Sequence, residues 1–171
     1  MRTTAFLIVF LAHAGLPGIP GGFGVTVFFF LSGYLISTLL RMEVERKGRI
    51  SFKLFYLRRA LRILPPFYLV LTAACVLALT GLTLGPISLR ATLAQALHYA
   101  NYWEAFHGFD GTANGTGVYW SLAVEEHFYA LFPALFALLI SAKLSGNAQR
   151  RFFFVICALV MLWRCALVFY F

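Results

Sequence analysis

Residues 23–40 read FGVTVFFFLSGYLISTLL, an apolar stretch without a charged side chain. A helix needs about 20 mainly apolar residues to cross the hydrocarbon core of a bilayer, and this stretch with its flanks is long enough. Backbone amides in hydrocarbon must pair within their own segment, and the stretch lacks the strict alternation of a barrel strand. It therefore predicts a transmembrane helix.

The rest of the chain has the same character. Hydrophobic residues make up 61% of the 171 residues, charged residues only 12%, and the mean hydropathy is +0.84. Too few polar side chains are present to cover a soluble globule of this size. Further spans are expected at 64–82, 120–142 and 152–171, with a shorter candidate at 3–14. The predicted fold class is all-α, a polytopic transmembrane helix bundle of about five membrane helices.

Basic residues gather in two of the connections. Residues 41–62 hold eight basic side chains against two acidic ones, and residues 143–151 hold three basic side chains and no acidic one. The connections at 15–22 and 83–117 hold only one basic and two acidic residues between them. Because short cytoplasmic loops collect Lys and Arg, the first two connections are expected inside the cell. This predicts a multi-pass protein of the inner (plasma) membrane with a cytoplasmic N-terminus, a lipid bilayer as partner and no nucleic acid.

The first apolar stretch has a second interpretation. Arg2, an apolar run and the sequence Ala12-His13-Ala14 together imitate a secretory signal peptide with a small-residue cleavage site. Retention as a helix is favoured because a histidine separates the two alanines and no soluble domain follows. In either case Gly15 lies outside the cell, so the rest of the topology is unchanged.

No metal site or resident cofactor is expected. The three cysteines, Cys75, Cys157 and Cys165, stand in apolar runs without a CxxC pair, which indicates packing rather than a disulfide framework or a thiolate site. The four histidines show neither HxxxH nor HExxH spacing, so zinc ligands would have to meet through the fold alone.

His13 is the first candidate catalytic residue. It stands eleven residues after Arg2, about 16 Å along a helix, which places it near the middle or in the outer half of the membrane. Ionisable groups there are costly and usually face a cavity or the bundle interior. An imidazole titrates near neutral pH and can take a proton from a hydroxyl nucleophile. The alternative is a histidine that bonds a neighbouring helix or lies at the outer interface.

The basic segment 51–64 is the second candidate site. Arg58 and Arg62 are four residues apart and share one helix face, beside Arg59, so together they can hold a polyphosphate. Apolar side chains on the other face indicate an amphipathic helix at the membrane interface, and the two prolines that follow are expected to separate it from the third membrane span. The alternative is a positively charged loop that touches anionic lipid.

An acidic pair near the start of the predicted span 120–142 is the third. Ser121 and Glu125 share a helix face, and Glu126 points about a quarter turn away. Ser121 as a cap, with carboxylates that complement the positive end of the helix, explains the pair equally well. Because His13 and Glu125 are both expected in the outer half of the membrane, the carboxylate could orient the imidazole and stabilise its charged form.

These features together resemble the acyltransferase family 3, integral membrane O-acyltransferases that modify bacterial polysaccharides, lipopolysaccharide, peptidoglycan and some small metabolites. The resemblance covers most of the chain. Its motifs are Arg2 and His13 with ten residues between them, the stretch 24–34, Phe55-x-x-Arg58, and 120–129 reading WSLAVEEHFY. One departure is His127, which stands where the family usually carries glutamine.

The resemblance implies that 1–171 is a partial membrane acyltransferase domain, the N-terminal half of a bundle of about ten helices, inactive without the missing C-terminal half. It implies an acyl-CoA co-substrate, such as acetyl-CoA, on the cytoplasmic side. It also implies transfer by His13, aided by Glu125, to a hydroxyl of a cell-surface carbohydrate or lipid-linked acceptor. The donor-binding residues that it implies are Arg2, Phe55, Arg58, Arg59 and Arg62.

Two other functions remain open at this point. Ionisable groups inside the membrane also mark ion-coupled transporters, although the two halves of the chain show no internal repeat. An inactive membrane remnant is the other alternative. For an acyltransferase, the connection 83–117 is expected to form the outer mouth where the acceptor docks.

Overall fold

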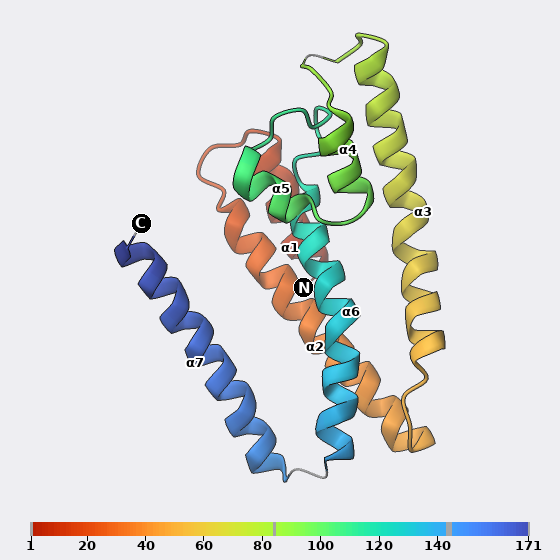
Figure 1. Ribbon diagram of the computed structural model, residues 1–171, viewed down its shortest axis with the longest axis vertical. Coiled ribbons are helices and arrows are strands. Elements are labelled where there is room, and N and C mark those ends of the chain that lie inside the picture. Colours follow the sequence, from red (N-terminus) through yellow and green to blue (C-terminus); the bar gives the residue numbers. More distant parts are fainter. Residues whose placement is uncertain (1, 84, 143–144, 171) are drawn as a thin grey trace. The chain divides into compact units, whose positions relative to one another are not determined.

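The structure, a computed structural model, describes residues 2–83, 85–142 and 145–170, without the side chains of Arg2, Arg164 and residues 167–170. The described residues form seven helices and no strand, which confirms the predicted all-α fold class (Figure 1). In chain order the helices are α1 (Arg2–His13), α2 (Gly21–Lys47), α3 (Phe52–Leu79), α4 (Leu89–Ala96), α5 (Ala100–His107), α6 (Tyr119–Ser141) and α7 (Gly146–Tyr170).

Three helices, α2, α3 and α6, are long and apolar enough to cross a membrane, and Thr3–His13 of α1 is a shorter apolar helix. Many of their large apolar side chains are exposed, for example Leu69 and Leu79, as expected for helices that lipid surrounds. These helices match four of the five expected segments. The fifth, 152–171, falls in α7 and reaches beyond the described residues, so its membrane span stays a prediction.

The helix α3 differs from the sequence expectation at its prolines. The sequence predicts a break at Pro65 and Pro66, and that prediction is wrong, because α3 is one helix of 28 residues with both prolines inside it. Each proline removes a backbone hydrogen bond, but packing outweighs this loss. The next residue, Phe67, is buried in a core with residues of α5 and α6, and its carbonyl accepts the hydroxyl of Tyr119 at 3.5 Å. The arginines at the start of α3 therefore belong to the same helix as the core residues.

The expected outer connection 83–117 contains two short helices, α4 and α5. Ser88 caps α4, because its hydroxyl oxygen accepts the N–H of Ala91 at 3.2 Å. Gln95 on α4 is buried, and its amide donates to the carbonyl and the hydroxyl oxygen of Thr116 at 3.2 and 2.8 Å. These bonds tie α4 to the residues just before α6.

The chain divides into two compact units, Met1–Leu131 and Phe132–Phe171. The second unit holds the end of α6 and all of α7, which begins where the hydroxyl oxygen of Ser145 accepts the N–H of Ala148 at 3.3 Å. Every candidate site residue lies in the first unit.

Within the first unit, α1 packs against the first turns of α2. A Cβ added to Gly24 would lie 2.8 Å from Val9 Cγ2 and 3.1 Å from the carbonyl oxygen of Ala5, and one added to Gly21 would lie 2.8 Å from Ala12 Cβ. Glycines on one helix face allow such close approach between membrane helices. They fix α1, and therefore His13 at its end, against α2.

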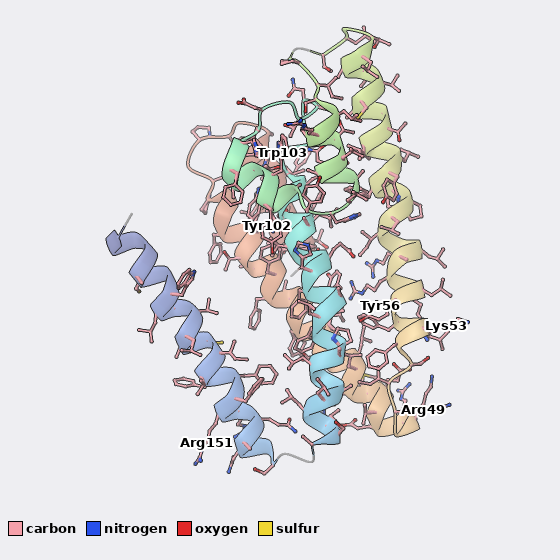
Figure 2. All side chains as sticks on the ribbon, in the orientation of Figure 1. Arg49, Lys53, Tyr56, Tyr102, Trp103 and Arg151 are labelled. Carbon is pink, nitrogen blue, oxygen red and sulfur yellow. The ribbon has the colours of Figure 1, made fainter. Side chains whose placement is uncertain are left out.

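In the first unit, α2, α3 and the part of α6 up to Leu131 alternate in direction. Figure 1 shows α3 running back along α2, and α6 returning in the direction of α2. Arg49 and Lys53 lie where α2 connects to α3, and Tyr102 and Trp103 of α5 lie at the opposite end (Figure 2). We call these two ends the α2–α3 end and the α5 end.

Candidate functional site

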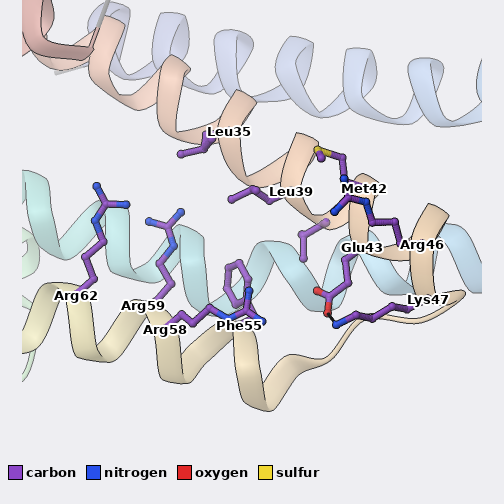
Figure 3. A pocket seen from close by; sticks show the side chains of 11 residues that line it. Leu35, Leu39, Met42, Glu43, Arg46, Lys47, Phe55, Arg58, Arg59 and Arg62 are labelled. Atoms are coloured by element: carbon purple, nitrogen blue, oxygen red, sulfur yellow. Dashed lines mark ion pairs between the residues drawn. The ribbon is translucent and has the colours of Figure 1, made fainter.

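A pocket of about 360 Å³ lies between α2 and α3 near the α2–α3 end. We call it the basic pocket because five basic side chains line it, against one acidic side chain, on walls that are otherwise apolar. The basic side chains are Arg46, Lys47, Arg58, Arg59 and Arg62. Figure 3 shows the guanidinium groups of Arg59 and Arg62 pointing from α3 toward α2. This combination suits a ligand that joins several phosphates to a less polar part.

The turn between α2 and α3 builds this pocket. α2 ends at Lys47 and is capped by Gly48, whose φ of +68° suits glycine and whose N–H donates to the Val44 carbonyl at 2.8 Å. In the last turn of α2, Lys47 Nζ lies 3.5 Å from Glu43 Oε1 and forms an ion pair with it. The other ion pair among the described residues joins Arg41 and Glu45 on the exposed side of α2. Neither pair uses an arginine of α3, which leaves those guanidinium groups available to an anion.

The three arginines of α3 differ in their surroundings. Arg58 and Arg62 are exposed, whereas Arg59 is half-buried. The guanidinium carbon of Arg59 lies 4.1 Å from the ring centroid of Tyr129 on α6 and 5.9 Å from that of Phe55. These are cation–π distances, and such contacts strengthen away from water. Arg59 of α3 is therefore held in place by a contact with α6.

A buried carboxylate lies beside this contact. Glu125 is 7% exposed, and its Oε1 accepts the hydroxyl of Ser32 at 2.5 Å and also the hydroxyl of Tyr129. Ser32 comes from α2 and is 1% exposed, and Tyr129 is 3% exposed. We call Ser32, Glu125 and Tyr129 the carboxylate junction. It joins α2 to α6 and gives a costly intramembrane carboxylate two hydrogen-bond donors.

His13 lines a second pocket of about 490 Å³ at the α5 end. We call it the His13 pocket, and the loop from α5 to α6 forms most of its wall. The other lining residues are Phe109, Thr112, Ala113, Asn114, Gly115, Gly117, Val118 and Trp120. His13 Nδ1 lies 2.8 Å from the carbonyl oxygen of Val9. A carbonyl only accepts, so Nδ1 donates in this contact, which favours the neutral tautomer whose Nε2 is the accepting nitrogen.

Burial perturbs two ionisable groups at the α5 end, outside the long helices. Burial raises the pKa of the Glu104 carboxyl to about 7, and its Oε1 has no hydrogen-bond partner among the described residues. Burial also lowers the pKa of His98, whose ring packs 4.4 Å from that of Phe67. Each group is therefore biased toward its neutral form.

The structure brings together four of the five residues that the sequence suggests for donor binding. Phe55, Arg58, Arg59 and Arg62 all line the basic pocket. The fifth, Arg2, begins α1, but its side chain lies outside the described residues. The roles of all five stay predictions.

The two suggested catalytic residues have different surroundings. His13 lines the pocket at the α5 end, whereas Glu125 lines a separate apolar cavity of about 200 Å³ with Phe29, Val124 and others. The described hydrogen bonds of Glu125 run to Ser32 and Tyr129. That Glu125 orients His13 stays a prediction.

Ser32 and Tyr129 are the residues to which the sequence reading gave no role. The available signal was that each carries a hydroxyl within an apolar run, where a polar group needs a partner on a neighbouring helix. That signal identifies the two hydrogen-bond donors. It does not identify their acceptor, because the local sequence does not show which helix faces them.

The whole chain, residues 1–171, matches the family model described as "Acyltransferase domain". The chain belongs to the acyltransferase family 3. Its membership agrees with the all-helical fold and the long apolar helices, so this is a multi-pass membrane protein of an acyltransferase family.

Relatives of the acyltransferase family 3 narrow the class further. Peptidoglycan O-acetyltransferase OatA of Listeria monocytogenes is 32% identical over 156 residues, which cover 87% of this chain and 25% of that protein. A Staphylococcus aureus (strain COL) protein named "Putative O-acetyltransferase" is 32% identical over 82% of this chain and 24% of its own length. "Putative peptidoglycan O-acetyltransferase YrhL" of Bacillus subtilis is 34% identical over 78% of this chain and 22% of its own length.

This chain thus spans about a quarter of the length of the curated relatives it matches. No solved structure matches it. The family model and these relatives together identify a membrane O-acetyltransferase family.

Proposed function

We propose that this chain contains the donor-binding and transfer residues of a membrane O-acetyltransferase that moves the acetyl group of acetyl-CoA to a hydroxyl of cell-surface carbohydrate, such as peptidoglycan. The single observation that carries the proposal is the basic pocket, where arginines of α3 that form no ion pair among the described residues converge with the cationic end of α2 on apolar walls. We also propose that residues 1–171 form part of one membrane acyltransferase domain.

The basic pocket matches the chemistry of a coenzyme A donor. The nucleotide part of that donor carries phosphates, which guanidinium groups bind by charge-assisted, often bidentate hydrogen bonds. Its arm is longer and less polar, and it would extend from the phosphates along the apolar walls that Leu35 and Leu39 supply. Arg58 and Arg62 are exposed and so accessible to the phosphates without breaking an internal contact.

His13 is the proposed general base. Its Nε2 takes the proton of the acceptor hydroxyl while that oxygen attacks the thioester carbonyl carbon. The carbon–sulfur bond then breaks, and the thiolate of coenzyme A takes the proton back from the imidazolium. The products are the acetyl ester and free coenzyme A, so no other reactant is needed. The contact of Nδ1 with the Val9 carbonyl supports this role, because it favours the tautomer in which Nε2 is the accepting nitrogen.

The His13 pocket is the proposed acceptor site. Phe109 and Trp120 offer aromatic faces, and Asn114 offers an amide that both donates and accepts hydrogen bonds. A sugar ring presents apolar C–H faces and hydroxyls, which suits such a wall. A hydroxyl placed there would lie beside His13.

The charge distribution supports a cytoplasmic N-terminus in the inner (plasma) membrane. Basic residues gather at the α2–α3 end, whereas α4 and α5 carry one arginine and one glutamate. Because cytoplasmic connections collect Lys and Arg, the basic pocket would open inside the cell, where acetyl-CoA is made, and the His13 pocket would open outside.

The test is acetyl transfer by membranes that contain the full-length protein, with labelled acetyl-CoA and peptidoglycan fragments. We expect label to appear as an ester on the carbohydrate, with one coenzyme A thiol released per ester. Arg90→Ala, which removes an exposed arginine of α4 away from both pockets, serves as the matched control and should behave like the unsubstituted protein. Movement of a solute without consumption of the thioester would overturn the proposal and favour a transporter.

A further inference from the structure

Arg59 is the residue that the proposed donor site does not fully explain. It lines the basic pocket, but its guanidinium lies over the ring of Tyr129 at 4.1 Å, while Arg58 and Arg62 remain exposed. An arginine that served only as one more surface cation would not be held by a buried aromatic ring of another helix. Its placement by α6 therefore needs a reason.

The carboxylate junction explains how Tyr129 is held. Its hydroxyl donates to Glu125 Oε1, which also accepts the hydroxyl of Ser32 on α2. Ser32 of α2 holds the carboxylate, and Tyr129 donates to the same oxygen from one turn further along α6, so this bond restrains the buried ring. Because the phenol donates a hydrogen bond, its ring is also a better partner for a cation on its face. Contacts therefore run from α2 through α6 to Arg59 on α3.

We propose that Tyr129 and Glu125 are positioning residues that hold the Arg59 guanidinium at the edge of the basic pocket, so that α6 sets where a donor phosphate is bound. This inference rests on the proposed function, because it takes acetyl-CoA as the ligand. Arg58 and Arg62 then supply charge from flexible, exposed side chains, and Arg59 supplies the fixed point.

Preorganisation is the physical reason for such an arrangement. A free arginine loses side-chain freedom when it binds a phosphate, whereas one already ordered loses little. The ordering of a single long side chain changes affinity by up to about tenfold. A second contact between α3 and α6 supports the same placement of the two helices, because the Tyr56 hydroxyl donates to the Ala130 carbonyl at 2.8 Å.

The test is a pair of double-mutant cycles on the full-length protein, with acetyl-CoA as the probe and its dissociation constant as the readout. The first cycle combines Arg59→Ala with Tyr129→Leu, and the matched cycle combines Arg58→Ala with Tyr129→Leu. Amounts in the membrane and elution as a single species serve as folding controls. If Tyr129→Leu does not fold, Tyr129→Phe replaces it in both cycles, because that variant keeps the ring and loses only the bond to Glu125.

We expect Arg59→Ala to weaken acetyl-CoA binding about tenfold and Tyr129→Leu about fivefold, the smaller factor because the arginine is retained. The double variant should be no weaker than Arg59→Ala alone within about twofold, because Tyr129 acts through Arg59. In the matched cycle the two factors should multiply. Factors that multiply in the first cycle as well would overturn the positioning role.

Glu125→Gln separates this inference from a role of Glu125 beside His13. The variant keeps an oxygen acceptor for both hydroxyls and removes the ionisable group, so we expect acetyl-CoA binding to weaken about threefold, and this loss to disappear when Arg59→Ala is also present. A large fall in kcat with unchanged binding would instead place Glu125 in the chemical step and overturn the inference. If the unsubstituted protein binds no acetyl-CoA, the proposed function fails first, an outcome distinct from cycles that multiply.

Discussion

The two pockets of the first unit are built in opposite ways. The basic pocket lies between two long helices and owes its character to charge, with five basic side chains against one acidic. The His13 pocket is walled by the loop from α5 to α6, and its lining carries aromatic, amide and hydroxyl groups. The first suits a ligand recognised by charge, and the second suits one recognised by shape and hydrogen bonds. Changes at the two ends should therefore affect different kinetic constants.

The largest effect should come from the His13 pocket. His13→Ala should lower kcat by about 10²- to 10⁴-fold, the usual contribution of a positioned general base, and leave the dissociation constant of acetyl-CoA unchanged. Single-turnover transfer from labelled acetyl-CoA, together with equilibrium binding of the same compound, measures both quantities. An equal loss of donor binding would mean that the two ends are not separate.

The basic pocket should respond in the opposite sense. Arg58→Ala combined with Arg62→Ala should raise the KM for acetyl-CoA by about 10- to 100-fold, since the two exposed guanidinium groups together contribute about 1.5–3 kcal/mol to phosphate binding, while the KM for the acceptor stays the same. Initial rates with each substrate varied in turn give these constants. Arg90→Ala is the control for loss of an arginine elsewhere, and an unchanged KM for acetyl-CoA would remove the two arginines from donor binding.

The packing of α1 on α2 links His13 to the rest of the unit. Gly24→Ala places a methyl group 2.8 Å from Val9 Cγ2 and 3.1 Å from a backbone carbonyl, so it should destabilise the fold by about 1–3 kcal/mol and also lower kcat by displacing His13. Thermal unfolding in detergent measures the first effect. Gly22→Ala is the matched control, because a Cβ there meets nothing within 4 Å. Equal unfolding temperatures for the two variants would contradict this account of α1.

The smallest effect should be pH-dependent and confined to the α5 end. Burial raises the pKa of Glu104 to about 7 from its ordinary value of 4.5. As the pH rises, the carboxyl therefore loses its proton in the unfolded chain before it does so in the folded protein. Stability from this group is full below pH 4.5, falls as the pH rises toward 7 and is constant above it. Glu104→Gln should therefore raise the unfolding temperature relative to the unsubstituted protein at pH 8 more than at pH 4.5. The same difference at both pH values would show that Glu104 is solvated.

Much of the α2–α3 end could be predicted from sequence, because its features are local. Apolar runs of span length locate α2 and α6, and the basic segment 51–64 contains the arginines of α3 that line the basic pocket. The prediction failed at Pro65 and Pro66, where helix propensity indicates a break but burial of Phe67 in the core maintains the helix.

The contacts between helices could not be predicted in this way. Glu125 is visible as an intramembrane carboxylate, but its bonds to Ser32, 93 residues earlier in the chain, depend on which faces of α2 and α6 meet. The helices α4 and α5 are only eight residues each, too short for a clear periodic pattern, and they are fixed by contacts such as Gln95 with Thr116.

The hydrogen bond from Ser32 to Glu125 also has a consequence for biogenesis. Because synthesis runs from the N-terminus, α2 and α3 enter the bilayer before α6 is made. Glu125 lies near the start of α6, so its cost on insertion is below the roughly 2.5–3.5 kcal/mol that applies to a charged residue at the centre of a helix. When α6 leaves the translocation channel, α2 is already in the bilayer, and its Ser32 hydroxyl can donate a hydrogen bond to that carboxylate. A helix made early thus lowers the cost of inserting a later one, so the order of translation contributes to how this protein reaches its fold.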